Sequence, residues 1–241
     1  MVRGFPRVKL LSEPRPGSYR ARNAGLAAAR GQFIAFTDAD CIPDVEWLAA
    51  GMAAAQSHHP IGIVAGRIDL FRDSILYSAA CEQYERTYAF DQEKNVKYHH
   101  CFTANWISPR SVLASHGGFD ATLKSGGDFA LSQAIHESGQ QIVYAPDMVV
   151  SHPVRATLHE LVHKRRRVIG GRWMMRRRRW ALLQWLLICS REAAGKAKFL
   201  LFNARLTPTE KLKVGGVLAV LTLVTLAEVF RIACGGVPRR A

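Results

Sequence analysis

The sequence predicts an α/β fold: a mixed sheet flanked by helices, followed by a helical C-terminal extension. Two observations lead to this prediction. Through the first two-thirds of the 241 residues, short apolar runs typical of buried strands alternate with longer segments of helical composition. From about residue 158 the strand-like runs stop, and long basic and apolar segments replace them. With 49% hydrophobic and 22% charged residues, the chain is neither wholly disordered nor a multi-span membrane protein.

The first part of the chain contains five predicted elements. An apolar run at 8–11 predicts a short strand. The segment 18–30 is rich in Ala and Leu and stops at a glycine, which is typical of a helix with a C-terminal glycine. The run 32–37 predicts a buried strand, and a Pro-Asp pair opens a helix that reaches about residue 57. A second apolar strand is expected over 61–68.

The middle of the chain continues the alternation. Asp73 is a candidate cap for a helix that runs to about residue 90. A strand over 102–108, a short helix ending at residue 116 and a Gly-Gly turn follow. The remaining predicted elements are a helix over 128–139 and two brief strands, 141–145 and 148–151, separated by Pro146.

The charge is distributed very unevenly. The net charge of the whole chain is +14, yet residues 1–163 carry a net charge of −1 and residues 164–241 a net charge of +15. We therefore expect two parts, a nearly neutral α/β domain over 1–160 and a basic, helical, membrane-associating region over 161–241. Such asymmetry indicates a polyanionic partner for the second part, either anionic lipid or nucleic acid.

The cysteines and the first residues bear on the compartment. Five cysteines form no CxxC pair and leave one unmatched, which favours a reducing compartment over a disulfide framework or a zinc knuckle. The first residues, MVRGFPR, contain no apolar core of a secretion signal.

Asp38 and Asp40 are the first candidate functional residues. They stand two apart at the C-terminal end of a predicted strand, where open α/β sheets bind ligands. Two carboxylates there suit Mg²⁺ or Mn²⁺, which prefer few carboxylates together with substrate phosphate oxygens. The alternative is that both aspartates only form a surface turn and cap the next helix, and the spacing does not decide between these interpretations.

Other candidates also have ordinary structural explanations. Asp128 follows Ser-Gly-Gly and is either a helix N-cap or, on a mobile loop, a general base. His152 alone is more typical of a structural histidine than of a ligand. Trp106 fits either the core or a platform for a sugar ring, and Cys41 is interpreted as a packing residue.

The order and the flanks of these residues resemble a known family. The segment 21–44, ARNAGLAAARGQFIAFTDADCIPD, resembles the middle of family 2 glycosyltransferases, which have the GT-A fold. Four later fragments resemble the acceptor-binding half of this family and occur in the same order: TANW at 103–106, GGFD at 117–120, GD at 127–128 and VSHP at 150–153. The resemblance covers roughly residues 8–170 and implies a GT-A-like, Rossmann-like sheet.

The resemblance implies a role for each matching residue. Asp40 matches the principal metal ligand, and Asp38 matches the aspartate near the nucleotide ribose, which also faces the metal. Asp128 matches the catalytic base of inverting members, and His152 a position that in some GT-A enzymes reaches the metal or the diphosphate. The remaining matches are the nucleotide-pocket residues Arg22 and Asn23, and the wall around the transferred sugar and acceptor, Asn105, Trp106 and Gly118.

The implied activity is metal-assisted transfer of a sugar from a nucleotide-diphosphate sugar to a hydroxyl of a glycan or lipid-linked acceptor. Mg²⁺ or Mn²⁺ would neutralise the departing diphosphate. Asp128 would remove the acceptor proton during a single displacement with inversion, so that no nucleophilic Ser or Cys is needed.

Three departures from the family pattern modify this expectation. Gly127 replaces the Glu that precedes the base in many relatives. Ile169 replaces the Gln of the QxxRW motif that Arg172-Trp173 resembles, so processivity is not predicted. The family opens with a strand–helix–strand unit that carries a base-reading Asp, and we expect this chain to be N-terminally incomplete, with an exposed sheet edge. A non-catalytic truncated remnant that binds membranes or partners is therefore the alternative function.

The basic region predicts association with an anionic membrane surface. Nine of the sixteen residues at 164–179 are basic, tryptophans are interleaved with them, and apolar stretches follow at 180–189 and 214–227. The stretch 214–227 would rise about 21 Å as a helix, which is short of a ~30 Å hydrocarbon core. A single span, a hairpin, an amphipathic helix and a buried helix stay open. A location on the cytoplasmic face of the cell membrane is expected, while nucleic-acid binding is the less favoured alternative.

Overall fold

The structure is a computed structural model that describes residues 8–73, 75–176 and 182–238. Its strands form one mixed sheet with the order β1-β4-β3-β5-β2. The β3–β5 pair is parallel, and the other three pairs are antiparallel. The strands are β1 (Phe33–Thr37), β2 (Ile42–Pro43), β3 (Ile61–Phe71), β4 (Asn105–Pro109) and β5 (Gln141–Pro153). The predicted mixed α/β sheet is confirmed.

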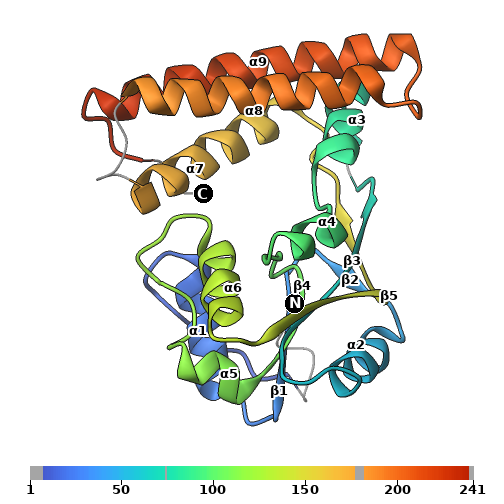
Figure 1. The fold of residues 1–241 in the computed structure, drawn as a ribbon, viewed down its shortest axis with the longest axis vertical. Helices are drawn as coiled ribbons and strands as arrows, with labels where there is room; N and C mark the ends of the chain where they lie inside the picture. Colours follow the sequence, from blue (N-terminus) through green and yellow to red (C-terminus); the bar gives the residue numbers. More distant parts are fainter. Residues whose placement is uncertain (1–7, 74, 177–181, 239–241) are drawn as a thin grey trace.

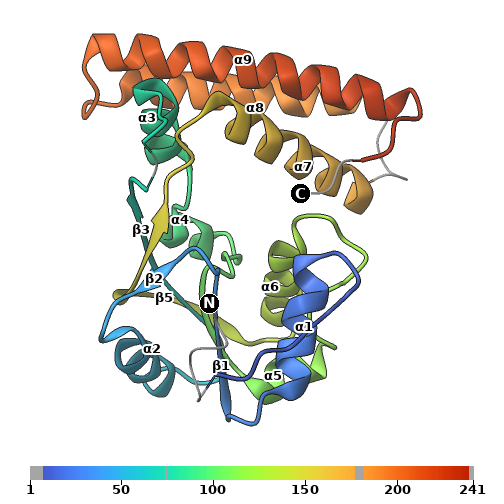
Figure 2. The same ribbon diagram turned by 180° about the vertical axis from the view of Figure 1, so that it is seen from behind.

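Helices cover both faces of this sheet and form a separate layer at one end of the molecule (Figure 1). Helices α1, α5 and α6 lie on one side of the sheet, and α2 lies on the other (Figures 1 and 2). The helices are α1 (Ser18–Ala28), α2 (Trp47–Gln56), α3 (Ala79–Tyr88), α4 (Gln92–Lys97), α5 (Arg110–Ser115), α6 (Gly127–Glu137), α7 (Leu158–Arg176), α8 (Leu182–Phe202) and α9 (Pro208–Ala233).

Each layer has its own apolar core. Tyr19 of α1, Trp106 of β4 and Leu131 of α6 belong to one cluster, which joins the sheet to the helices on its first face. On the opposite face, Ala55 of α2 packs against β3 and β5. A third cluster joins α3 and α7 to the α8–α9 pair through Tyr84 and its neighbours. The basic region is thus packed onto the rest of the protein through α3 and α7.

Two predictions from the sequence, the strand over 8–11 and the start of the helix at Asp73, are wrong. Residues 8–11 form no strand: Val8 and Leu10 are 55% and 61% exposed, and no described strand pairs with them. The helix expected from Asp73 begins only at Ala79: its N-cap Ser78 is in an extended conformation, and the backbone N–H of Ser78 donates to the carbonyl of Ala156. The short helix α4 was not expected.

The two brief strands predicted at 141–151 are one strand, β5, with an irregularity in the middle. Its partner register runs from Gly66 opposite Ala145 directly to Arg67 opposite Val149. The three residues between them, which include Pro146, bulge out of the ladder. Because proline cannot donate a ladder hydrogen bond, the bulge accommodates Pro146 without ending the strand.

Part of the basic run lies outside the described residues. Residues 164–176 belong to α7, whereas 177–179 and Trp180 are not described.

Candidate active site

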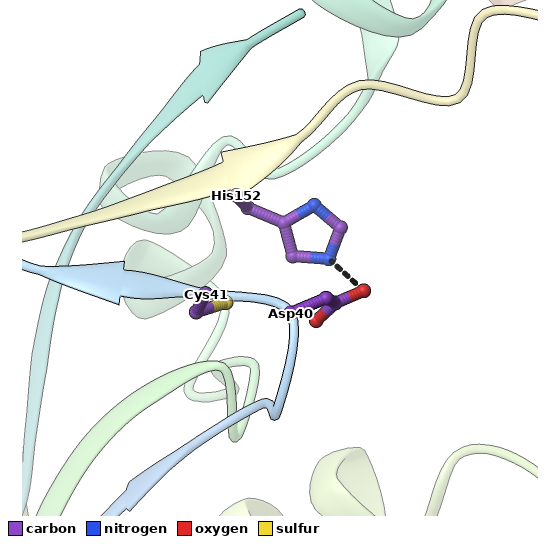
Figure 3. A group of neighbouring side chains, drawn as sticks. All are labelled: Asp40, Cys41 and His152. Atoms are coloured by element: carbon purple, nitrogen blue, oxygen red, sulfur yellow. Dashed lines mark ion pairs between the residues drawn. The ribbon is translucent and has the colours of Figure 1, made fainter. Parts of the chain in front are cut away.

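The register between β2 and β5 brings three potential metal ligands together. These strands are antiparallel, with Ile42 opposite Ser151. The next residues outward, Cys41 and His152, are therefore neighbours, and the turn that precedes β2 carries Asp40 to the same place. Figure 3 shows the carboxylate of Asp40 directed toward the imidazole of His152, with Cys41 beside them. The pairing of β2 with β5, which are more than a hundred residues apart in the sequence, thus creates the group.

The donor atoms of this group fit a divalent cation. The ligand atoms of Asp40, Cys41 and His152 lie within 4.8 Å of one another, and Nε2 of His152 is 4.0 Å from Oδ2 of Asp40. Nδ1 of His152 lies 2.7 Å from the carbonyl oxygen of Pro153, so Nδ1–H donates to it and Nε2 keeps its lone pair. Burial lowers the pKa of His152, which favours the neutral, metal-binding ring. Oxygen and nitrogen donors suit Mn²⁺ or Mg²⁺, whereas a thiolate favours softer ions.

Asp38 is paired with Arg22 of α1. Nη2 of Arg22 donates a hydrogen bond to Oδ1 of Asp38 over 2.6 Å. Both side chains are partly shielded, with 19% and 33% of their surfaces exposed. In this structure Asp38 is thus paired with Arg22 while Asp40 lies beside His152, and the shared metal site of the two aspartates stays a prediction.

Asp128 lies in the first turn of α6 and belongs to the same cluster as Arg22. Oη of Tyr19 donates to Oδ1 of Asp128 over 3.3 Å and accepts a hydrogen bond from the backbone N–H of Gly127. Burial raises the pKa of Asp128, and the charge of Arg22 opposes that rise. The N-cap of α6 is Gly126, in the left-handed region at φ 82°, so the N-cap interpretation of Asp128 is wrong. Asp38 and Asp128, ninety residues apart, are linked through Arg22.

Two further cations face the cluster and were missed in the sequence. Arg167 of α7 is partly buried, and this burial, together with the nearby charge of Arg155, lowers its pKa, while Asp128 and Asp38 raise it. Arg155 also acts on His152 electrostatically. Arg167 had been counted with the basic residues at 164–179 that predict lipid binding, and Arg155 had not been singled out. Because so many of the residues at 164–179 are basic, periodicity could not indicate which of them turn inward.

A buried carboxylate fixes Arg155 near the cluster. Glu85 of α3 is 1% exposed and pairs with Arg155 at 3.4 Å and with Lys164 of α7. The two cations also lie over the ring of Phe90, which in turn contacts His152 with a centroid separation of 4.4 Å. The basic extension is thus connected directly to the candidate metal group.

Trp106 and Asn105 do not form a sugar-binding wall in this structure. Trp106 is fully buried in the core, and its indole N–H donates to Oγ of Ser108. Asn105 is also fully buried; its Nδ2 donates to the carbonyl oxygens of Arg67 and Met148 at the β5 bulge. Their predicted contact with acceptor is corrected, because strand β4 lies in the middle of the sheet and its side chains are covered on both faces.

Asn23 and Gly118 form a structural clamp. The side chain of Asn23 donates to the carbonyl of Phe119 and accepts from its N–H, at 2.7 and 2.9 Å. Gly118 has φ 74°, and a Cβ there would lie 2.7 Å from Oδ1 of Asn23. This geometry uses the hydrogen-bonding capacity of Asn23 to hold α1 in place, which orients Arg22 one residue earlier. The structure thus shows positioning contacts for Asn23 and Gly118, and their direct roles in binding stay predictions.

Comparison with known proteins finds a family match. The sequence model of the family described as "Glycosyl transferase family 2" matches residues 1–117, which include α1, β1 and the turn with Asp38 and Asp40. Residues 1–117, just under half of the chain, thus match glycosyl transferase family 2. The mixed sheet flanked by helices fits the GT-A class of α/β fold that was expected for this family.

Curated relatives of this chain come from Haloferax volcanii and Mycobacterium tuberculosis. The glycosyltransferase AglE of Haloferax volcanii is 29% identical over 187 residues, covering 74% of this chain and 60% of the relative. The pre-mycofactocin glycosyltransferase of Mycobacterium tuberculosis is 28% identical over 172 residues, covering 68% of this chain and 36% of the relative. The chain therefore spans less than two-thirds of the length of these relatives.

A solved structure with a similar arrangement is a mannosyltransferase from Pyrobaculum calidifontis in complex with GDP-Man and Mn²⁺. It is 18% identical, with a TM-score of 0.46, and the match covers 95% of this chain and 59% of the other. Asp128 and His152 lie beyond the residues that the family model matches, so their roles depend on the geometry described above.

Proposed function

We propose that this chain transfers a sugar from a nucleoside diphosphate sugar to a hydroxyl group, with inversion at the anomeric carbon. Asp128 accepts the proton of the acceptor hydroxyl while its oxygen bonds to the anomeric carbon. The bond from that carbon to the diphosphate breaks, and its electron pair leaves with the nucleoside diphosphate. The reaction needs a base and a cationic environment for the leaving group, and it needs no covalent intermediate.

The observation that carries this proposal is the linkage of Asp38 to Asp128 through Arg22. A carboxylate with a raised pKa lies beside fixed positive charges, the arrangement needed for a base next to an anionic leaving group. Arg167 adds a second guanidinium that acts on both aspartates. In the free protein these cations are partly neutralised by Asp38 and Asp128. A bound diphosphate would replace a carboxylate as their anionic partner.

Asp40 and His152 are the residues that would hold a divalent cation, Mg²⁺ or Mn²⁺. When bound, such an ion supplies electrostatic stabilisation of the departing diphosphate. Asp40 is accessible, with 57% of its side chain exposed, while the buried His152 is oriented by Pro153. Asp40 can therefore reorient toward a substrate-bound ion, whereas the imidazole of His152 is already held in place.

The acceptor in this proposal is a glycan or a lipid-linked glycan at the cytoplasmic face of a membrane. Support comes from the helical layer at the end of the molecule, which contains the apolar helix α9 and the excess of positive charge. Nucleic acid is not the expected partner.

The proposal is tested with the purified full chain, Mn²⁺ and a panel of UDP- and GDP-sugars. Release of nucleoside diphosphate is measured by chromatography, and the anomeric configuration of any product by NMR. We expect Asp128→Asn to lower the rate by about 10²–10⁴-fold. Glu137→Gln, which removes an exposed carboxylate from the other end of α6, leaves it unchanged.

Two outcomes would overturn the proposal. Equal turnover by the Asp128→Asn variant would exclude Asp128 as the base. Absence of both turnover and nucleotide binding, measured by calorimetry at millimolar ligand, would instead favour a non-catalytic remnant that acts through the helical layer.

A further inference from the structure

Helix α9 has two apolar faces, and the protein covers only one of them. The inner face packs on α3, α7 and α8 and includes Val214, Leu221 and Val229. The opposite side, which we call the outer face of α9, is exposed along the helix from residue 212 to residue 230. Its members are Leu212, Gly216, Ala219, Val220, Leu223, Ala227 and Phe230.

The outer face of α9 forms a continuous apolar stripe. Its residues recur at intervals of three and four, which places them on one side of a helix. Leu212, Leu223 and Phe230 are 79%, 67% and 59% exposed, and no charged residue interrupts the series. A soluble surface helix normally has charged residues there, so this stripe indicates a surface that contacts an apolar partner.

Helix α8 lies beside α9 (Figures 1 and 2) and carries exposed apolar residues of its own. Its buried residues, Trp185 and Cys189, are on one side, whereas Leu183, Leu187 and Leu201 are 67%, 50% and 68% exposed on the other. We call this the outer face of α8. Two adjacent helices thus present apolar residues away from the helices they pack on.

The charges around these faces are positive. Exposed cations of α8, the turn and the start of α9 border them, namely Arg191, Lys198, Arg205 and Lys213. At the turn, Lys198 and Arg205 also line a hollow together with Phe199 and Phe202. Aromatic and cationic side chains in this combination match the interface between headgroups and acyl chains of an anionic bilayer.

The acidic residues of this layer are engaged within the protein. Glu192 pairs with Arg165 and Arg172, and Glu228 pairs with Arg231. Glu210 accepts hydrogen bonds from Thr207 in the capping box at the start of α9. Among the acidic side chains of the described residues 182–238, Glu192 and Glu228 are therefore paired with arginines, and Glu210 is fixed at the start of α9 by Thr207.

Length and composition alone would allow α9 to cross a membrane: it has 26 residues, and 39% of its most apolar window is buried in the protein. The packing of its inner face opposes a crossing. Oγ1 of Thr225 accepts a hydrogen bond from Nε of Arg165 over 2.6 Å, and Tyr84 and Leu161 share a core with Val217 and Leu218. Withdrawing α9 into a bilayer would expose that core and place a Glu–Arg pair in hydrocarbon.

We propose that the outer faces of α8 and α9 form one docking surface that lies in the plane of an anionic bilayer, with neither helix crossing it. Leu183, Leu201, Leu212, Leu223 and Phe230 enter the acyl boundary, while the bordering cations contact phosphate headgroups. The inference specifies the residues and orientation of attachment, and it does not depend on the proposed sugar transfer.

The experiment uses the full chain with vesicles of phosphatidylcholine containing phosphatidylglycerol, and with vesicles of phosphatidylcholine alone, in a flotation assay. We expect binding to the anionic vesicles and at least about a tenfold loss of affinity for Leu223→Glu. Replacing Lys198 or Arg205 with Gln is expected to weaken binding by about fivefold each. The matched control is Leu48→Glu, which alters a leucine of α2 that is 54% exposed and lies away from the α8–α9 layer.

Labelling of Cys234 distinguishes a helix α9 that lies in the plane of the bilayer from one that crosses it. It is exposed and follows α9, whereas Cys41 is half-buried and Cys81, Cys101 and Cys189 are buried. With the protein bound from outside, a membrane-impermeant maleimide is expected to label the chain as in solution, and Cys234→Ser to remove that labelling. Protection of Cys234 inside vesicles would overturn the proposal in favour of a span. Absence of vesicle binding, with a dimer that Leu223→Glu converts to a monomer, would overturn it in favour of a second copy of the chain.

Discussion

Arg22 donates a hydrogen bond from Nη2 to Oδ1 of Asp38 across 2.6 Å, and its side chain is one of the charges that act on Asp128. Its guanidinium also lies over the ring of Tyr19, at 5.7 Å from the centroid, and Tyr19 donates to Asp128. Helix α1 therefore holds both aspartates through two side chains three residues apart. Reactivity at Asp128 and the charge at Asp38 are coupled, and this coupling leads to the first prediction.

Replacing Arg22 with Gln is expected to move the acid side of the pH–rate profile to higher pH. A general base must be ionised; burial raises the pKa of Asp128 and the positive charge of Arg22 lowers it. Without that charge the carboxylate stays protonated to a higher pH, so the rate falls sooner as the pH decreases. Steady-state rates between pH 5 and pH 9 measure the effect. Arg30→Gln, which removes an exposed cation beyond the end of α1, is the control; identical profiles for both variants would contradict the linkage.

The candidate metal group predicts different results for its nitrogen and its sulfur ligand. His152→Ala is expected to weaken Mn²⁺ binding by at least about tenfold, because the oriented Nε2 is lost. Cys41→Ser is expected to change the affinity by less than about twofold, since Mn²⁺ prefers oxygen and nitrogen donors. Titration followed by electron paramagnetic resonance of free Mn²⁺ measures both. An equal loss in the two variants, with tight Zn²⁺ binding by the wild type, would show that the group selects a softer ion.

Gly171 of α7 lies against the loop that precedes α6 and Asp128, and this contact leads to a further prediction. A Cβ at this position would lie 2.6 Å from the carbonyl oxygen of Ser125, two residues before the start of α6. Gly171→Ala is therefore expected to displace that loop, to lower the free energy of unfolding by about 1–3 kcal/mol and to reduce kcat about tenfold. Gly195→Ala of α8, where a Cβ meets nothing within 4 Å, is expected to stabilise the protein slightly. Denaturant unfolding and kcat are measured for both, and an unchanged kcat in Gly171→Ala would refute the link.

Glu192 predicts a pH-dependent contribution to stability. Arg165, Arg172 and Lys196 surround it, and they hold its pKa at about 2 despite its burial. A carboxyl with a lowered pKa in the folded state stabilises the protein above its ordinary pKa of about 4.5, and this stabilisation is lost as the pH falls toward 2. Glu192→Gln is therefore expected to cost on the order of 2 kcal/mol at pH 7.

The pH dependence of this loss is the decisive measurement. Thermal unfolding between pH 7 and pH 3 is expected to show the difference between wild type and Glu192→Gln shrinking below pH 4.5. Glu93→Gln, which breaks an exposed pair with Lys97 on α4, is expected to cost less than about 0.5 kcal/mol at any pH. A difference for Glu192→Gln that stays constant with pH would show that packing, and not the charge, is lost.

The order of secondary structure and the position of the acidic turn could be predicted because they depend on local sequence. Apolar runs at 32–37 and 61–68 form strands, the Ala-rich segment forms α1, and the Gly-Gly pair at 117–118 has positive φ. Asp38 and Asp40 follow a strand, as expected. The resemblance to family 2 glycosyltransferases is also a property of the sequence alone, since it depends on residues and their order.

Contacts between distant segments could not be predicted in this way. Whether Trp106 lies in the core or against a sugar depends on which layers cover β4, and both of its faces are covered. The division of the acidic pair, with Asp38 bonded to Arg22 and Asp40 beside His152, follows from the docking of α1 and the register of β2 on β5.

By itself the sequence determined the mixed α/β order of elements, the resemblance to family 2 glycosyltransferases and the basic, helical extension, because each of these depends on local residue patterns and their order. Only the tertiary structure decided which side chains are buried and which meet. Arg167 turns toward Asp128, and one stripe of α9 stays uncovered, because burial depends on surfaces brought together from far apart in the chain. The same helical region thereby contributes cations to the candidate active site and leaves an apolar face on the outside.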